Sequence, residues 1–343
     1  MISLLVVNYR SAALAAEAVR TARASSAQPL QVVIVDNSCD PSEAEKLRSH
    51  ADTLIVSDTN RGYAGGINLG RVSCDAETII VSNPDVTLAP GAIDHLQDAL
   101  REAAVAGPAF FWDDDHQWML PPGDLNTAPE KLDEVLASRS RAWREQRDRR
   151  RFRKRVAFWS LRQTTETRML SGAVMAIRAA DFDRVEGFDE RFPLYFEESD
   201  FLRRIAAMRR RIVYVPAARC RHLFNQSAAQ VASEAAAHYA QSELRYLEKW
   251  NGPFVARALK RMERPAPPLV AAEPLRLPLS VSRADVVIEA SPLASFATAA
   301  GHFPAGREID VPAGILSTRT GDLYLRVVVR DTGLVLGTYK ITP

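Results

Sequence analysis

Four short apolar runs alternate with helical patterns in the first 104 residues, and this alternation constrains the fold more than any other feature of the chain. The runs cover residues 2–7, 30–35, 54–57 and 77–82. A β-α-β-α-β-α-β order predicts a parallel sheet whose strands are joined by right-handed crossovers. The sequence therefore predicts an α/β fold built on a mostly parallel sheet.

Polar residues follow these runs directly. Asn8-Tyr9 follows the first run, Asp36-Asn37 the second and Asn83-Pro84-Asp85 the fourth. Ligands of open α/β sheets bind at the carboxyl ends of the strands, so these residues are candidates for a binding site. Taken alone, Asn-Pro-Asp is more simply explained as an ordinary turn. Whether Asn83-Pro84-Asp85 has a functional role depends on which other residues lie at the same edge of the sheet.

Overall composition excludes several classes of protein. The 343 residues are 47% hydrophobic and 25% charged, which is typical of a globular chain long enough for two or more domains. A net charge of +2 argues against a globally basic nucleic-acid binder. The three cysteines, Cys39, Cys74 and Cys220, show no CxxC pattern and indicate reduced thiols rather than a disulfide framework or a zinc site.

We expect no signal peptide, because the amino terminus lacks a basic leader and enters an apolar strand at once. We also find no apolar run of the roughly 18 residues that a membrane-spanning helix needs. The expected location is the cytoplasm, with any membrane contact peripheral and at the inner face of the plasma membrane.

One stretch is strongly basic. Residues 139–155 contain ten basic and two acidic side chains, a local net charge of +8. Two interpretations remain open for it. The stretch is either a solvated helix face or mobile insert, or, as residues 139–159 with their aromatic side chains, a surface for anionic lipid headgroups or a phosphate-bearing acceptor.

Changes of composition suggest domain boundaries. We expect a main domain at residues 1–264, with a variable basic insert at 112–168 that begins as a loop and a helical extension at 230–264. A proline-rich linker at 265–280 and a small all-β domain at 281–343, resembling a β-sandwich, would follow.

Three carboxylates crowd the start of a predicted helix: Glu197, Glu198 and Asp200. Helix capping explains one or two of them, since a helix amino terminus favours negative charge. The preceding aromatic residues, Tyr195 and Phe196, reduce solvation and so raise a carboxyl pKa toward the range of a general base. Asp85 and His222, each after a strand, could hold a divalent cation together with substrate oxygens.

Taken in order, these stretches resemble the family 2 glycosyltransferases of the GT-A fold, which are inverting enzymes that use nucleotide sugars. The resemblance covers residues 1 to about 230. It rests on Val6-Val7-Asn8-Tyr9, Val33-Ile34-Val35-Asp36-Asn37-Ser38, Asn60-Arg61-Gly62-Tyr63-Ala64-Gly65-Gly66-Ile67-Asn68, Asn83-Pro84-Asp85, Ser171-Gly172-Ala173, Gly187-Phe188-Asp189-Glu190, Tyr195-Phe196-Glu197-Glu198-Ser199-Asp200, and His222 with Ser227. The Asn-Pro-Asp form is similar to that of bacterial rhamnosyltransferases of cell-surface polysaccharide assembly.

The resemblance implies a donor site for a UDP- or dTDP-sugar, in which Asp36 contacts the pyrimidine base. The implied donor-binding residues are Asn8, Tyr9, Asp36, Asn37, Arg61, Gly62, Gly65, Gly66, Asn68, Asn83 and Asp85. Asp85 and His222 would hold Mg²⁺ or Mn²⁺ on the diphosphate. Asn83 stands where the family's Asp-x-Asp motif has its first acid, which leaves one protein carboxylate for the metal.

The resemblance also implies that Glu198 is the catalytic base, with Glu197 and Asp200 shaping the site. The family usually has Asp at the position of Glu198, so Glu197 and Asp200 remain alternatives for the base. The implied acceptor is a glycan or a polyprenyl-diphosphate-linked glycan, and the sugar moved is expected to be L-rhamnose.

We expect no nucleic-acid partner and allow for a homo-oligomer. The alternative function is a catalytically inactive GT-A-fold protein that binds glycans or acts as a scaffold. A nucleotidyltransferase is disfavoured, because Asn8-Tyr9-Arg10-Ser11 lacks the glycine-rich loop expected after the first strand of such an enzyme.

Overall fold

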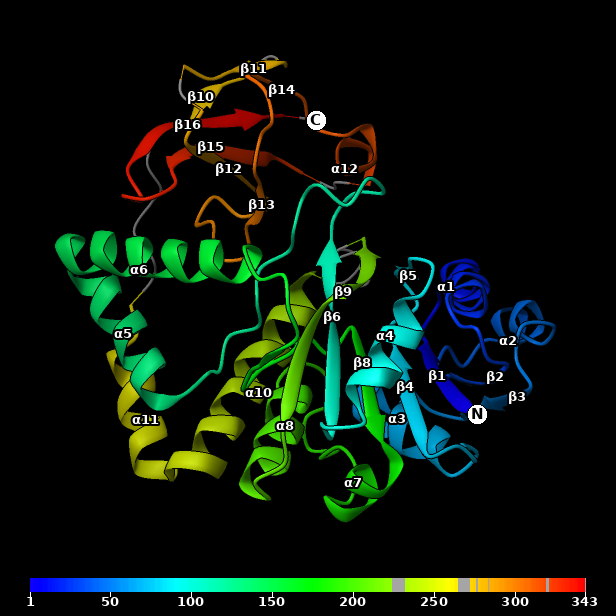
Figure 1. The fold of residues 1–343 in the computed structure, drawn as a ribbon. Helices are drawn as coiled ribbons and strands as arrows, with labels where there is room; N and C mark the ends of the chain where they lie inside the picture. The colour runs from blue at the N-terminus through cyan, green and yellow to red at the C-terminus, as the bar shows by residue number, and fades with distance from the viewer. Residues whose placement is uncertain (224–231, 265–271, 276, 283, 319–320, 343) are drawn as a thin grey trace. The chain divides into compact units, whose positions relative to one another are not determined.

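The chain folds into two compact units, seen in a computed structural model (Figure 1). The structure describes residues 1–223, 232–264, 272–275, 277–282, 284–318 and 321–342. Unit 1 comprises residues 1–109, 123–125 and 162–250, and unit 2 comprises residues 110–122, 126–161 and 251–343. The units are described separately below.

Unit 1 is built on a nine-stranded sheet with the order β3-β2-β1-β4-β8-β6-β9-β5, and β7 pairs with β9. The first four strands in this order are parallel and agree with the four apolar runs of the sequence: β1 (Ile2–Asn8), β2 (Leu30–Asp36), β3 (Thr53–Val56) and β4 (Thr78–Ser82). All residues of β1 and β4 are buried, as expected for strands covered on both faces. The predicted parallel sheet is therefore present.

Helices connect these parallel strands. They are α1 (Ala12–Ala24), α2 (Pro41–Leu47), α3 (Gly62–Arg71) and, after the short strand β5 (Val86–Leu88), α4 (Ala92–Ala99). Helix α1 buries Ala15, Ala18, Val19 and Ala22 on one face, the spacing of an amphipathic helix. Helix α3 contacts both β1 and β2, which brings the glycine-rich segment to the carboxyl ends of these strands.

The other half of the sheet contains antiparallel pairs: β8 pairs antiparallel with β4 and β6, and β7 with β9. Its strands are β6 (Val105–Phe111), β7 (Thr165–Glu166), β8 (Val174–Arg178) and β9 (Ile212–His222), with helices α7 (Ala179–Arg184) and α8 (Glu197–Ala207) between β8 and β9. Strand β5 pairs antiparallel with β9, and Val86 lies opposite His222. This pairing places Asp85 beside His222 although 137 positions separate them in the sequence.

Unit 2 contains a separate β-sheet. Its order is β10-β16-β15-β12-β13, and a two-stranded sheet pairs β11 with β14. The strands are β10 (Glu273–Pro274), β11 (Leu279–Ser280), β12 (Val286–Ser291), β13 (Ala300–His302), β14 (Glu308–Ile309), β15 (Leu323–Val329) and β16 (Val335–Ile341), and α12 covers Ala313–Thr318. Strands β16, β15 and β12 form the centre of the five-stranded sheet.

The basic stretch is helical and belongs to unit 2. After a loop at its start, the segment predicted as an insert forms α5 (Ala128–Arg139) and α6 (Arg141–Trp159). The helical extension is two helices, α10 (Ala232–Asn251) and α11 (Pro253–Met262), of which α11 packs on α5. Contacts thus group α5, α6 and α11 with the carboxy-terminal sheet, which is a different division from the boundaries expected from composition. Much of the expected linker lies outside the described residues.

Much of the charge of α6 is matched within unit 2. Arg147 and Arg150 pair with Asp133 of α5 at 3.2 and 2.5 Å. The Arg155 side chain is 6% exposed and pairs with Glu289 of β12, which is fully buried and also accepts from Arg326. Phe152 and Trp159 pack with Val287 and Val328 beneath the helix. One face of α6 therefore docks within unit 2, through Phe152, Arg155 and Trp159, while basic side chains such as Arg149 and Arg153 stay exposed.

Among the described helices, none is long and apolar enough to cross a membrane.

Candidate active site

Polar side chains at the ends of β1 and β2 form the first part of the site. Asn8 and Asp36 are opposite each other in the register, and both are fully buried. Asn8 Nδ2 donates to Asp36 Oδ1 at 2.9 Å and to Ser38 Oγ at 3.1 Å. Asp36 Oδ2 is buried and has no hydrogen-bond partner. Because an unmatched buried oxygen is costly, this oxygen is a strong candidate for accepting from a ligand.

Asn37 and the glycines of α3 continue this surface. Asn37 Nδ2 donates to the Gly62 carbonyl at 2.9 Å, whereas Asn37 Oδ1 is buried without a hydrogen-bond partner. A Cβ atom at Gly66 would lie 2.7 Å from Val7 Cγ1, and one at Gly65 would lie 2.9 Å from Arg61 Cβ. Glycine is therefore required at position 66 for α3 to lie this close to β1.

Gly62 joins this surface to the segment before the acidic helix. Its φ of +69° is in the left-handed region, and an added Cβ would lie 2.4 Å from the Pro193 carbonyl oxygen. Tyr63 N donates to the same carbonyl at 3.0 Å. Position 62 therefore needs glycine for two reasons: its left-handed backbone and the lack of space for a Cβ atom.

The remaining donor-site candidates have mixed surroundings. Tyr9 is 41% exposed with the Arg10 guanidinium 5.2 Å from its ring centre, and Arg61 is exposed at the start of α3. Asn68 is used by the fold, because it accepts from Phe188 N at 2.9 Å and donates to Phe188 O at 2.8 Å. Asn83 is half-buried, and its backbone N–H donates to Ala173 O.

Asp85 and His222 meet at the pairing of β5 with β9. His222 Nε2 lies 3.4 Å from Asp85 Oδ1, and Asp85 is 5% exposed. Burial raises the pKa of Asp85, but the hydrogen bond and positive charge of His222 outweigh it, so the pKa lies below its usual value. A carboxylate that stays ionised in a buried place beside an imidazole suits a hard divalent cation such as Mg²⁺ or Mn²⁺.

Two side chains do not make a complete metal site. Among the residues that the structure describes, no group of three or more His, Cys, Asp or Glu side chains could hold a metal ion. Mg²⁺ commonly takes only one or two carboxylates and completes its sphere with water and substrate phosphates. Asp85 and His222 therefore fit a cation that is held jointly with a diphosphate.

Helix α8 begins with an unusual backbone. Tyr195 and Phe196, directly before Glu197, have φ values of +66° and +69°. The left-handed region is unfavourable for residues other than glycine, and two in succession are rare. Phe196 is anchored in an aromatic cluster with Phe192 and Tyr246, which holds this conformation. Strain of this kind is concentrated at functional sites.

The two glutamates at the start of α8 have raised pKa values. Glu197 is 6% exposed, and its Oε2 has no hydrogen-bond partner. Burial, and then the charge of Glu198, raises the pKa of Glu197 well above 4.5, and burial also raises the pKa of Glu198. Gly172 lies against Glu198, since an added Cβ would be 3.1 Å from the Glu198 Cβ. Both carboxyls thus resemble general bases of raised pKa.

Tyr63 links the acidic groups electrostatically. Its hydroxyl donates to Gly172 O at 2.8 Å. Burial raises the pKa of Tyr63 first, and the charges of Glu197, Glu198 and Asp85 raise it further. Tyr63 is therefore sensitive to the charge of Glu197, Glu198 and Asp85, and its hydrogen bond to Gly172 O ties α3 to the segment before β8.

Asp200 has a different environment from the two glutamates. Its Oδ2 accepts from Arg204 at 2.8 Å, and its Oδ1 contacts Lys249 Nζ at 2.6 Å and Trp250 Nε1 at 2.9 Å. Both oxygens of this fully buried carboxylate are engaged, which is the arrangement of an anchor between α8 and α10. No local pattern points to Lys249 and Trp250, because their partner Asp200 lies about 50 positions away in the chain.

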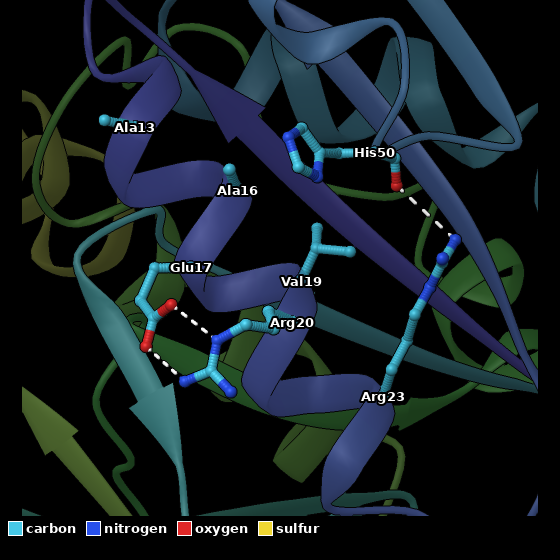
Figure 2. A pocket seen from close by; sticks show the side chains of 7 residues that line it. All are labelled: Ala13, Ala16, Glu17, Val19, Arg20, Arg23 and His50. Carbon is cyan, nitrogen blue, oxygen red and sulfur yellow. Dashed lines mark hydrogen bonds and ion pairs between the residues drawn. The ribbon is translucent and has the colours of Figure 1, made fainter.

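One surface depression lies elsewhere in unit 1. Figure 2 shows its lining from α1, with His50 beside it. Glu17 accepts two hydrogen bonds from Arg20, at 2.7 and 2.6 Å, and Arg23 pairs with Asp52 at 3.6 Å. Its charged side chains are matched to one another, and none of the predicted site residues lines it.

Comparison with known proteins identifies the family. The model of the family described as glycosyltransferase like family 2 matches residues 1–241. The chain belongs to this family and is a glycosyltransferase by class. The match confirms the resemblance drawn from the sequence motifs, and with it the expected GT-A α/β fold.

Two curated relatives are similar over most of their length. Both are N-acetylglucosaminyl-diphospho-decaprenol L-rhamnosyltransferases of Mycobacterium tuberculosis, from strains CDC 1551 and H37Rv. Each is 26% identical over 247 residues, which cover 66% of this chain and 77% of the relative.

Solved structures show weaker likeness. The mannosyltransferase PcManGT of Pyrobaculum calidifontis, in complex with GDP-Man and Mn²⁺, has a TM-score of 0.47 and 16% identity, covering 75% of this chain and 73% of that chain. S. aureus TarS (residues 1–349) has a TM-score of 0.40 and 17% identity, covering 69% and 64%.

Proposed function

We propose that this protein moves a sugar, L-rhamnose, from a UDP- or dTDP-sugar to a hydroxyl group of a glycan acceptor, with inversion at the anomeric carbon. One observation carries the proposal: buried carboxylates with unmatched oxygens occur at the end of β2 and at the start of α8. Such oxygens are expensive unless a ligand matches them. They also disfavour the non-catalytic scaffold, which has no need to retain them.

The donor would bind along the ends of β1 and β2. Asp36 Oδ2, which has no hydrogen-bond partner, would accept from the N–H of a pyrimidine base, while Asn8 holds the Asp36 side chain. Gly65 and Gly66 permit a close backbone approach, and Arg61 would neutralise phosphate charge.

Asp85 and His222 would hold Mg²⁺ or Mn²⁺. The cation, when bound, supplies charge stabilisation for the departing diphosphate.

Glu198 is the proposed base, and it takes the proton of the acceptor hydroxyl. The acceptor oxygen then forms a bond to the anomeric carbon while the bond from that carbon to the diphosphate oxygen breaks on the opposite face. Glu197 remains the alternative base, and Asp200 is the least suitable of the three because Arg204, Lys249 and Trp250 engage both its oxygens.

The proposed acceptor is a polyprenyl-diphosphate-linked sugar, as the name of the mycobacterial relatives states for those proteins. Peripheral membrane contact through residues 139–159 and a cytoplasmic location remain predictions, and so does a homo-oligomer. On α6, the exposed basic side chains include Arg149 and Arg153.

A transfer assay tests the proposal. The protein is given dTDP-L-rhamnose or a UDP-sugar, Mg²⁺ or Mn²⁺, and a synthetic N-acetylglucosaminyl diphosphate with a short alkyl chain, and products are resolved by mass spectrometry. We expect one added deoxyhexose. No transfer and no hydrolysis of any donor would contradict the proposed function.

A further inference from the structure

Three aromatic rings lie together beside the acidic start of α8. Tyr195 and Phe196 precede that helix, and Tyr239 comes from α10. The Tyr195 and Tyr239 ring centres are 5.6 Å apart at 65°, and those of Phe196 and Tyr239 are 5.2 Å apart at 57°. Both are ordinary tilted or edge-to-face contacts of aromatic pairs.

The rings differ in exposure. Phe196 is 2% exposed, Tyr195 is half-buried and Tyr239 is 44% exposed. Tyr246 lies seven residues after Tyr239, hence on the same face of α10, and it is 1% exposed in the cluster with Phe196. The same face of α10 therefore carries an exposed aromatic ring at Tyr239 and a buried one at Tyr246. Core packing accounts for Tyr246 and leaves the exposed area of Tyr239 unexplained.

The patch adjoins the proposed base. Tyr195 is two residues from Glu197 and three from Glu198, and it is close enough for both charges to raise its pKa, after burial. Tyr195 and Phe196, both with a left-handed backbone, directly precede Glu197 and Glu198 in the chain. A pyranose has apolar C–H faces and hydroxyls at its edge. A ring surface next to a base can therefore support the face of the sugar while one hydroxyl reaches the carboxylate.

We propose that Tyr195 and Tyr239 form a stacking platform for the sugar ring of the acceptor, oriented so that its nucleophilic hydroxyl meets Glu198. The inference rests on the proposed function and deepens it, because it assigns the acceptor side of the site. The platform takes a pyranose, whatever lipid or alkyl chain carries that sugar.

Binding without turnover tests the platform. The probe is the short-chain N-acetylglucosaminyl diphosphate, observed by saturation-transfer difference NMR in the absence of donor, with wild type, Tyr239→Ala, Tyr239→Trp and Phe254→Ala. Tyr239 is partly exposed, so its replacement leaves the core intact, and Phe254 of α11, 87% exposed, is the matched aromatic control. We expect signals on the pyranose C–H protons in wild type, Tyr239→Trp and Phe254→Ala, and their loss in Tyr239→Ala.

Transfer kinetics and nucleotide binding distinguish a failure of the stacking platform from a failure of the proposed glycosyltransferase function. Tyr239→Ala should raise the acceptor KM about tenfold, the loss expected for one aromatic contact, with the donor KM and the dTDP affinity unchanged. Unchanged pyranose signals in Tyr239→Ala, or a rise in the donor KM instead, would overturn the platform while leaving the glycosyltransferase proposal standing. A wild type that transfers no sugar and binds no dTDP would instead remove the function.

Discussion

Each unit of the molecule buries carboxylates, but the two do so in different ways. In unit 2, Glu289 is fully buried, and its two oxygens accept from Arg155 at 2.8 Å and from Arg326 at 2.6 Å. In unit 1, Asp36 is equally buried and Glu197 nearly so, yet each keeps one oxygen without a hydrogen-bond partner. Asp200 shows that unit 1 also contains a fully matched acid.

The difference separates acids that hold the fold together from acids that await a ligand. A buried ion pair that is broken on one side is strongly destabilising, so a matched acid such as Glu289 cannot be altered cheaply. An unmatched buried acid already lowers stability in the free protein, and it is retained where a ligand later satisfies it. The contrast therefore predicts opposite effects of mutation in the two classes.

Glu198→Gln should have the largest effect. Loss of the proposed base lowers transfer by roughly 10²- to 10⁴-fold while dTDP binding is kept. In the wild type, transfer should also fall as the pH is lowered through the raised pKa of Glu198, because only the ionised carboxylate accepts a proton. Initial rates over a pH series check both statements. Asp58→Asn, at an exposed acid, is the control, and undiminished transfer by Glu198→Gln would place the base elsewhere.

Glu289→Leu should have the next largest effect, on stability alone. It leaves Arg155 and Arg326 buried without their partner, which costs about 3–5 kcal/mol in the free energy of unfolding measured in urea. Replacing all three, with Arg155→Met, Glu289→Leu and Arg326→Leu together, should recover most of this loss, since no charge is left unpaired. A loss below about 1 kcal/mol for the single variant would show that the matched acid is not structural.

Asp200→Asn tests whether a matched buried acid of unit 1 also stabilises the fold. The neutral amide weakens the contacts with Arg204, Lys249 and Trp250, and we expect a loss of about 2–3 kcal/mol in stability. Urea unfolding measures it, with Asp58→Asn again as the control. If stability were unchanged and transfer alone were abolished, Asp200 would belong with the catalytic acids.

Glu197→Gln should have the smallest effect and the opposite sign. The pKa of Glu197 is raised in the folded protein, so stability falls as the pH rises above the unfolded value of about 4.5 toward the folded pKa. An uncharged amide escapes this loss and should stabilise the protein by about 1 kcal/mol at pH 7. The gain in melting temperature should disappear below pH 4.5, and a gain that is independent of pH would contradict this reading.

Sequence patterns predict the individual strands and helices and the segments that contribute residues to the site. The apolar runs predict β1 to β4, and the glycine-rich segment after β3 is the helix α3, where Gly66 lies against Val7. The positions of Asp85 and His222 after strands, together with the family resemblance, predict that they share a cation. No local pattern reports that Val86 faces His222 across two distant strands.

Tertiary contacts decided what the sequence left open. The basic stretch gave two interpretations because charge counted along the chain does not reveal partners such as Asp133 and Glu289. Similarly, the resemblance implies Glu198 as the base and leaves Glu197 and Asp200 as alternatives. The contacts of Asp200 with Arg204 and with the distant Lys249 and Trp250 distinguish it from the two glutamates. Ser227, part of the motif that includes His222, lies outside the described residues.

The most direct measurement is ligand-dependent thermal stability with dTDP and Mn²⁺. At 100 times its dissociation constant, a ligand adds about 2.7 kcal/mol to the stability of the protein that binds it. We expect the melting temperature of the wild type and of Asp200→Asn to rise with dTDP and Mn²⁺, and the rise to be largely lost in Asp36→Asn and Asp85→Asn. No rise in the wild type, or an equal rise in all four proteins, would contradict the view that the unmatched acids of unit 1 await a nucleotide and its cation.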